Sequence, residues 1–346
     1  MKIKGLEREF FVIGENVHTT RILLRKGKRV TKNPEGLESV QYKDSDGIER
    51  FLIIPNEVKR TQDYEEGRIK HVKIAIQSAM GDPSPSAYEG MQYLRQMILK
   101  QVAKNVDFID LNVDEISLNP AEQKTAMSWL VQTAQNISSV PLSIDSSNIE
   151  TLEAGLAACR LNGIQHMLNS ASLERIEVLD LAKRYNAAVI VSAAGSSGMP
   201  QNDDERVQNA SRMVDTALDK EIQLKSIYID PLIFPISVDS EFGNHAFEAI
   251  RRLREKYGPE IHITGGFSNV SFGIPCRRLV NNVFLNLVIQ AGADSGIIDP
   301  ITSRLDHVLS MERASIPYKL TENMLLGRDR FCKKFLRAYR KGELNG

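Results

Sequence analysis

Three consecutive segments decide the fold: "VDFIDLN" at residues 106–112, "NPAEQKTAMSWLVQTAQNI" at 119–137 and "PLSID" at 141–145. The first and third are short apolar runs without the alternation of a half-exposed strand. Such runs are typical of parallel strands that helices cover on both faces. The middle segment has helical spacing, and its Asn119–Pro120 pair is a typical helix start. Together they predict a strand–helix–strand unit with parallel strands.

The same rhythm recurs along the chain. Further apolar runs occupy residues 10–16, 164–169, 187–193, 226–231, 261–269 and 294–300, with helical stretches between them. Eight strand–helix units within about 300 residues predict a (β/α)8 barrel in preference to a doubly wound sheet. The segment after the first strand reads "IGENVHTT" and lacks the G-x-G-x-x-G pattern, which disfavours a dinucleotide-binding fold.

One long segment interrupts this rhythm at residues 17–82, far more than a usual strand-to-helix connection. Within it, "LESVQYKDSDGIERFLIIP" (37–55) predicts a β-hairpin about the Asp-Ser-Asp-Gly turn, and "EGRIKHVKIAIQSAM" (66–80) predicts a helix. We therefore expect a barrel over residues 1–320 that carries an insertion at 17–82, followed by a C-terminal helix at 321–346.

Composition narrows the function classes. The 346 residues include 44 basic and 44 acidic side chains, so no net positive charge indicates nucleic-acid binding. No segment approaches the roughly 18 apolar residues of a membrane span, and no secretory leader is evident, so we expect a soluble, cytoplasmic protein. The three cysteines are far apart and the six histidines share no ligand spacing. We expect no metal on this chain and treat His18 and the other histidines as ordinary surface or core residues.

Polar side chains stand where the predicted strands end. In a parallel barrel these ends meet at one rim, where active sites lie. Each follows apolar residues, and an unpaired carboxylate in such surroundings is costly. The pattern favours a ligand rich in N–H donors, such as a pterin, whose N3–H and 2-amino group one carboxylate can accept together. The residues are Glu15, Asn16, Asp110, Asn112, Asp145, Asn169, Ser192, Asp230, Ser268, Asn269 and Asp299.

A purely structural interpretation exists for several of these residues taken singly. Asp145 could cap the helix that begins near Asn148, and Asp230 in "YIDP" could close a strand before a proline turn. Asn112 and Asn169 could satisfy backbone groups in loops. Their shared position at strand ends is what favours a binding site.

These motifs resemble the pterin-binding methyltransferases that act with tetrahydrofolate and a corrinoid protein. That family is related to the folate module of cobalamin-dependent methionine synthase and, more distantly, to dihydropteroate synthase. The matching segments occur in order over residues 10–300: "IGEN" (13–16), "DLNV" (110–113), "IDSSN" (144–148), "EAGL" (153–156), "MLNSAS" (167–172), "YIDPLIFP" (228–235), "FSNVS" (267–271) and "DSGIIDP" (294–300).

The resemblance implies a role for each matching residue. It implies that Asp145, Asn169 and Asp230 hold the pterin ring, that Asp110 and Asn112 lie beside it, and that Asn269 lies at the pterin N5. Arg277 is a further expected contact. Glu15, Asn16, Ser268 and Asp299 are additional candidates.

The resemblance also implies an activity and its partners. The expected reaction moves a methyl group between N5 of tetrahydrofolate and the cobalt of a corrinoid, in a direction that the sequence leaves open. The corrinoid would come from a partner protein or as free cobalamin, and 5-methyltetrahydrofolate and tetrahydrofolate would be substrates. Family members are often homodimers, so a homodimer is expected.

Two alternatives remain at this stage. A condensing enzyme like dihydropteroate synthase fits less well, because no glycine-rich anion loop follows the "DLN" strand and "SNVSF" stands where a lysine would be expected. A non-catalytic pterin-binding subunit is the other alternative. The chain also departs from the compact methyltransferases in its insertion and in Asp114–Glu115, where the relatives carry a glycine and a small residue.

Overall fold

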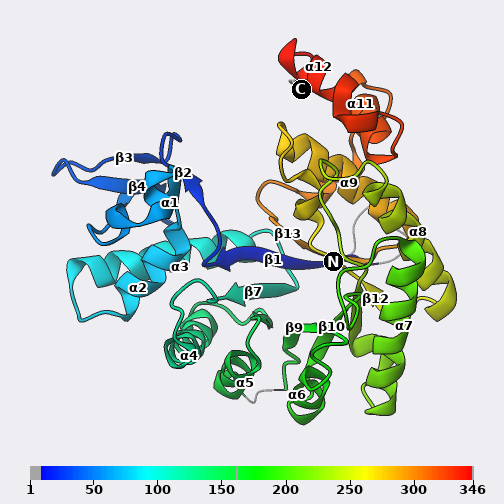
Figure 1. Cartoon of the computed structure of the whole chain (residues 1–346). Coiled ribbons are helices and arrows are strands. Elements are labelled where there is room, and N and C mark those ends of the chain that lie inside the picture. The colour runs from blue at the N-terminus through cyan, green and yellow to red at the C-terminus, as the bar shows by residue number, and fades with distance from the viewer. Residues whose placement is uncertain (1–8, 161–162, 345–346) are drawn as a thin grey trace. The chain divides into compact units, whose positions relative to one another are not determined.

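The computed structural model describes residues 9–160 and 163–344, and its strands and helices alternate as the sequence predicts (Figure 1). Eight parallel strands each precede a helix, which is the (β/α)8 barrel class. The strands are β1 (Phe11–His18), β7 (Phe108–Asn112), β8 (Leu142–Asp145), β9 (Met167–Ala171), β10 (Ala188–Ser192), β11 (Ile227–Asp230), β12 (His262–Ile263) and β13 (Ser295–Ile298). The helices that follow them are α3 (Pro85–Val102), α4 (Pro120–Ile137), α5 (Ile149–Ala158), α6 (Val178–Arg184), α7 (Asp203–Asp219), α8 (Phe242–Tyr257), α9 (Arg277–Ala291) and α10 (Leu305–Leu309).

The strands are buried in the way that parallel pairing requires. Every residue of β7, β10 and β13 is buried, which explains why these runs do not alternate in polarity. The helices begin where the sequence places their start signals. The Asn119 side chain accepts the Ala121 N–H ahead of Pro120, and Asn148 does the same for the Glu150 N–H.

The chain divides into two compact units, one formed by residues 15–166 and the other by residues up to Gly14 together with those from Met167 onward. In the first unit β7 and β8 pair in parallel, with Asn112 opposite Asp145. In the second unit the strands β9 to β12 pair in sequence order, and the first residues of β1 pair with β13.

The insertion lies within the first unit and contains the predicted hairpin. Strands β4 (Glu38–Lys43) and β5 (Glu49–Ile53) pair antiparallel about the turn at Asp44, and β3 (Val30–Lys32) extends the sheet by one strand. Arg50 donates to Glu89 on α3 at 2.7 Å, which ties this sheet to the barrel helix. The remaining elements of the insertion are β2 (Leu23–Leu24), η1 (Val58–Arg60), α1 (Gln62–Glu65), β6 (Arg68–Ile69) and α2 (His71–Met80).

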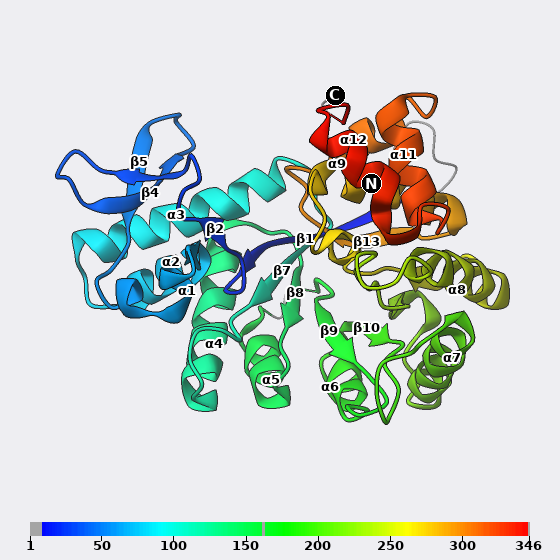
Figure 2. The same ribbon diagram turned by 45° about the horizontal axis from the view of Figure 1, so that its top comes forward.

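Near the end of the second unit α11 (Ile316–Leu325) packs on α9, and the last helix α12 (Lys333–Arg340) packs on α11, as Figure 2 shows. Ahead of β13, Asp294 accepts from Arg254 at 2.7 Å and from the backbone N–H of Ile263 at 2.8 Å, which joins α8, β12 and β13. None of the helices in the described part of the chain combines the length and apolar character that a membrane span needs. The other elements of this unit are η2 (Leu224–Ser226), η3 (Phe267–Ser271) and η4 (Arg330–Cys332).

The end of the chain corrects the prediction of one helix over residues 321–346. Up to residue 344 the structure has the two helices α11 and α12 with η4 between them, and residues 345–346 lie outside the described residues. Gly327, which follows α11, has a φ of +71°, a backbone conformation that glycine adopts readily and that ends a helix.

Gly90 tests how closely α3 packs on the insertion helix α2. A methyl group at Gly90 would lie 2.6 Å from the backbone oxygen of Ala75, so the helices must move apart to accept one. We expect Gly90→Ala to lower the free energy of unfolding by about 1–3 kcal/mol, although alanine favours helix by about 1 kcal/mol. Equilibrium unfolding in urea measures this change in the free energy of unfolding. Arg95→Ala, at an exposed position of the same helix, is the control. An unchanged or raised stability of Gly90→Ala would contradict the tight packing.

Candidate active site

Two carboxyls and a histidine meet toward the carboxyl ends of the strands in the first unit. Asp110 on β7 is 0% exposed, and its Oδ2 lies 2.8 Å from Nε2 of His18 at the end of β1. Asp145 at the end of β8 accepts a hydrogen bond from the Asn112 amide at 3.0 Å. One ligand atom from each of His18, Asp110 and Asp145 lies within 4.8 Å of the other two. The structure therefore brings Asp110, Asn112 and Asp145 together, but Asp110 lies in the middle of β7 and does not end its strand as predicted.

The proximity of these groups changes their ionisation. Burial raises the pKa of Asp145 to about 7, and the negative charge of Asp110 adds to the rise. Burial by itself would lower the pKa of His18, but its contact with the Asp110 carboxylate outweighs burial and the pKa is raised. Both His18 and Asp145 therefore keep a proton up to a higher pH than the same groups do in water.

The expectation that His18 is an ordinary residue is wrong, because it belongs to this cluster. His18 and Asp110 lie far apart in the sequence and on different strands, so spacing along the chain could not reveal their contact. One imidazole and two carboxylates are also a donor set that can hold a divalent cation. The contact between His18 and Asp110, with the Asn112 hydrogen bond to Asp145, accounts for the same cluster without a cation.

Asn112 and the two acidic residues that follow β7 also contact the surrounding backbone or the insertion. The Asn112 Oδ1 also accepts the Asp114 N–H at 3.0 Å, so the structural role considered for Asn112 exists beside its contact with Asp145. Asp114 accepts from the Ser146 hydroxyl and the Ser147 N–H. Glu115 pairs with Lys70 of the insertion at 2.8 Å.

The first strand supplies two further candidates, which lie inside β1 and not at its end as predicted, because β1 continues to His18. Glu15 lies 3.6 Å from Arg21, and the backbone N–H of Asn16 donates to Gln101 on α3. A separate cavity of about 410 Å³ between α2 and the start of α4 contains none of the predicted site residues.

In the second unit, Asp230 and Asn269 lie over the same pair of glycines. A methyl group at Gly265 would lie 3.2 Å from Oδ1 of Asp230, and one at Gly266 would lie 3.0 Å from Nδ2 of Asn269. The two glycines thus leave room for both polar side chains. Burial raises the pKa of Asp230 to about 6, although the Leu232 N–H and the charge of Arg206 oppose the rise.

Asn269 does not end a strand, which corrects the prediction for residues 261–269. Strand β12 ends at Ile263, and Asn269 lies in the 3-10 turn η3. Arg277, the first residue of α9, donates to the Ser268 carbonyl at 3.1 Å and to the Ser271 hydroxyl at 2.9 Å. These contacts brace the turn that carries Asn269.

The remaining candidates of this unit also have local partners. Asp299 accepts the Ile301 N–H at 2.9 Å and so closes the turn after β13. The Ser192 hydroxyl at the end of β10 accepts the Ala194 N–H at 3.2 Å. Asn169 does not end its strand as predicted, because β9 continues to Ala171; it lies in the middle of β9 and pairs with Ile190 of β10. That residues of both units surround one pterin ring stays a prediction.

The raised pKa of Asp145 makes its charge unfavourable to the folded state. A carboxyl whose folded pKa lies above its unfolded value contributes most stability at low pH and loses it as pH rises toward 7. We expect Asp145→Asn to raise the melting temperature by about 2–6 °C at pH 8 and by less at pH 5. Differential scanning calorimetry at pH 5 and at pH 8 measures these melting temperatures. The exposed Asp82→Asn is the control. Equal stability of the variant and the natural protein at pH 8 would contradict the assignment.

Comparison with known proteins places the chain in a family. Residues 85–299 match the pterin binding enzyme family, which is more than half of the chain. Over 261 residues the chain is 28% identical to the methylcorrinoid:tetrahydrofolate methyltransferase of Eubacterium limosum, covering 73% of this chain and 89% of that protein. Over 210 residues it is 28% identical to a methionine synthase of Mycobacterium leprae, covering 57% of this chain but 17% of that longer protein.

Solved structures agree on the fold. The dihydropteroate synthase of Stenotrophomonas maltophilia is similar with a TM-score of 0.52 at 18% identity, covering 63% of this chain and 86% of that one. The enzyme of Xanthomonas albilineans is similar with a TM-score of 0.51 at 16% identity, covering 65% and 86%. At these identities the likeness shows the barrel fold alone. With the family match, the fold and the carboxylates at the strand ends, the chain belongs to the pterin-binding enzymes.

Proposed function

We propose that this protein is a methyltransferase that moves a methyl group between N5 of tetrahydrofolate and the cobalt of a corrinoid. The observation that carries the proposal is the similarity, along nearly the whole relative, to a methylcorrinoid:tetrahydrofolate methyltransferase. That name describes transfer from methylcorrinoid to tetrahydrofolate, and we propose the same direction here. The corrinoid is a substrate that a partner protein carries or that arrives as free cobalamin.

The carboxylates suit recognition of the pterin. The ring presents N3–H and a 2-amino group side by side, and one carboxylate can accept both. Asp230, whose pKa is about 6, is mostly ionised at neutral pH and can act as this acceptor. Asp145, Asn169, Asp110 and Asn112 are the further proposed contacts, and Asn112 already holds Asp145 in place at 3.0 Å.

Methyl transfer requires control of the N5 atom. As the N5–carbon bond forms, the cobalt–carbon bond breaks, its electron pair stays on cobalt, and the N5 proton is released to solvent. The proposed role of Asn269 is to accept the N5–H bond and so orient the N5 lone pair toward the methyl carbon. In the reverse direction its amide would donate to N5 as the amine leaves, which is stronger binding in the transition state than in the ground state.

A condensing reaction like that of dihydropteroate synthase is the second candidate. The solved structures named above show only the shared barrel at 16% and 18% identity, so they do not favour that reaction. Turnover of a pterin pyrophosphate with p-aminobenzoate, without any methyl transfer, would support the condensing enzyme. Binding of tetrahydrofolate with neither reaction would support a non-catalytic subunit.

Asn269 gives the sharpest test of the proposed reaction. We expect Asn269→Ala to lower turnover by roughly 10–1000-fold, in the range of losing one positioned hydrogen-bonding group. The affinity for tetrahydrofolate should fall much less, because the carboxylates bind the ring. Absorbance of the corrinoid with methylcobalamin as donor measures turnover, and calorimetric titration measures affinity.

The matched control removes an amide from an exposed position of α7. Gln208→Ala should leave turnover and affinity unchanged, since Gln208 lies on the solvent side of that helix. Full activity of Asn269→Ala would show that the N5 role belongs to another residue.

A further inference from the structure

Arg206 is a buried guanidinium that the proposed reaction does not use. It lies in the first turns of α7 and is 0% exposed, which makes it one of the largest fully buried side chains among the described residues. Its Nη1 donates to the Asn202 carbonyl at 2.9 Å and its Nε to the Leu232 carbonyl at 3.4 Å. Its Nη2 has no hydrogen-bond partner among the described residues. Burying a guanidinium charge with so few hydrogen-bond partners costs folding free energy, and another interaction must compensate for that cost.

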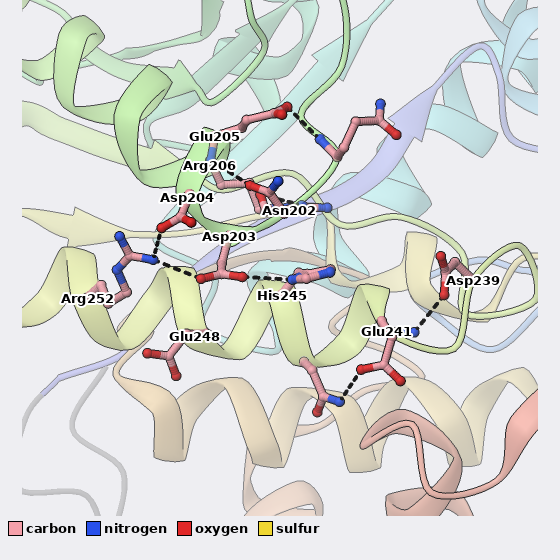
Figure 3. Close-up of polar contacts among 12 residues, drawn as sticks. Asn202, Asp203, Asp204, Glu205, Arg206, Asp239, Glu241, His245, Glu248 and Arg252 are labelled. Atoms are coloured by element: carbon pink, nitrogen blue, oxygen red, sulfur yellow. Dashed lines mark hydrogen bonds and ion pairs between the residues drawn. The ribbon is translucent and has the colours of Figure 1, made fainter.

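The acidic neighbours of Arg206 on α7 face other partners. Figure 3 shows Asp203 reaching His245 and Arg252 on α8, both at 2.8 Å, and Asp204 reaching the same arginine at 2.8 Å. The Glu205 carboxylate accepts the Gln201 N–H at 2.8 Å. The turn thus directs its carboxylates toward α8 and the backbone, whereas its arginine contacts the segment after β11.

Two aromatic rings support the guanidinium from that segment and the next helix. Its central carbon lies 4.8 Å from the centre of the Phe234 ring and 5.9 Å from that of Phe242. Cation–π contacts of this kind offset part of the lost hydration and fix the plane of the guanidinium. The side chain is therefore held in one place beside the end of β11.

Arg206 and Asp230 meet on one residue, Leu232. The Asp230 Oδ1 accepts the Leu232 N–H at 2.8 Å, and Arg206 donates to the carbonyl of the same residue. Leu232 has a φ of +65°, which is unfavourable for a residue with a side chain and persists only where its surroundings impose it. The carboxylate and the guanidinium hold this turn from its two ends.

We propose that Arg206 is a positioning residue for Asp230: it fixes the turn after β11 and supplies the positive charge that keeps the carboxylate ionised for a pterin. This inference rests on the proposed function for its ligand, but the link between the two side chains stands on their shared contact with Leu232. Among the described neighbours of Asp230, Arg206 provides the opposing charge. Ser192 on the paired strand β10 and Gly265 after β12 are neutral.

The test follows the ionisation of Asp230 directly. Carboxyl ¹³C NMR of aspartate-labelled protein, with Asp230→Asn to assign the signal, gives the titration midpoint without any ligand. We expect a midpoint near pH 6 in the natural protein and a clearly higher midpoint in Arg206→Gln. Arg252→Gln is the matched control, because it removes a guanidinium from the same pair of helices but not from Asp230. An unchanged midpoint in Arg206→Gln would overturn the proposal.

Calorimetric titration with tetrahydrofolate between pH 6 and pH 9 gives the second measurement. If the midpoint rises to between 7 and 8, the ionised fraction at pH 7 falls by about two- to tenfold, and affinity should fall with it. This loss of affinity should disappear at pH 9, where Asp230 is ionised both in the natural protein and in Arg206→Gln. A loss of equal size at every pH would indicate a merely structural role and contradict the proposal.

Two further outcomes are informative. No binding of tetrahydrofolate by the natural protein at any pH would end the proposed function, whereas the NMR midpoints would still decide the link between Arg206 and Asp230. If circular dichroism shows that Arg206→Gln does not fold, Arg206→Met carries the test. Methionine removes the charge and can pack against Phe234 and Phe242, so the same rise of the Asp230 midpoint is expected, and no rise would overturn the proposal.

Discussion

Burial of carboxylates at the ends of parallel strands is the constraint on which the candidate site depends. When helices cover both faces of a sheet, residues toward the carboxyl ends of its strands lie in surroundings that exclude water. An ionised carboxylate needs a partner there. Asp110, with no exposed surface, has the His18 imidazole at 2.8 Å. Asp145 has a neutral amide at 3.0 Å, and its pKa rises to about 7. A ligand that brings N–H donors would offset the cost of burying these charges.

The two units hold their acidic residues in different ways. In the first unit one ligand atom from each of His18, Asp110 and Asp145 lies within 4.8 Å of the other two, and the pKa values of His18 and Asp145 are both raised. In the second unit Asp230 relies on one backbone N–H and on the charge of Arg206, and its pKa rises only to about 6. The second arrangement leaves a carboxylate that stays ionised near neutral pH, which suits an acceptor for the donor edge of a pterin.

The sequence predicts the strands well because burial on both faces leaves uninterrupted apolar runs, such as residues 106–112 and 187–193. It predicts the hairpin of the insertion from the Asp-Gly turn. It does not reveal the contact between His18 and Asp110, because pairing of side chains from separate strands leaves no local pattern. Arg206 is hidden for a similar reason: in "DDERV" it looks like one more charge on an exposed helix start, and only the fold shows that it faces inward.

The residues around Asn269 give this side chain space and hold its 3-10 turn in place. After β12 the two glycines give space to Asp230 and Asn269, which side chains at those positions would fill. Arg277 then holds the turn through the Ser268 carbonyl and the Ser271 hydroxyl, at 3.1 and 2.9 Å. The role proposed for Asn269, which accepts a hydrogen bond in one state and donates one in another, would gain from such a support, since catalysis by a positioned group depends on a fixed geometry. These two hydrogen bonds of Arg277 thus favour a role in holding the turn over direct contact with the pterin.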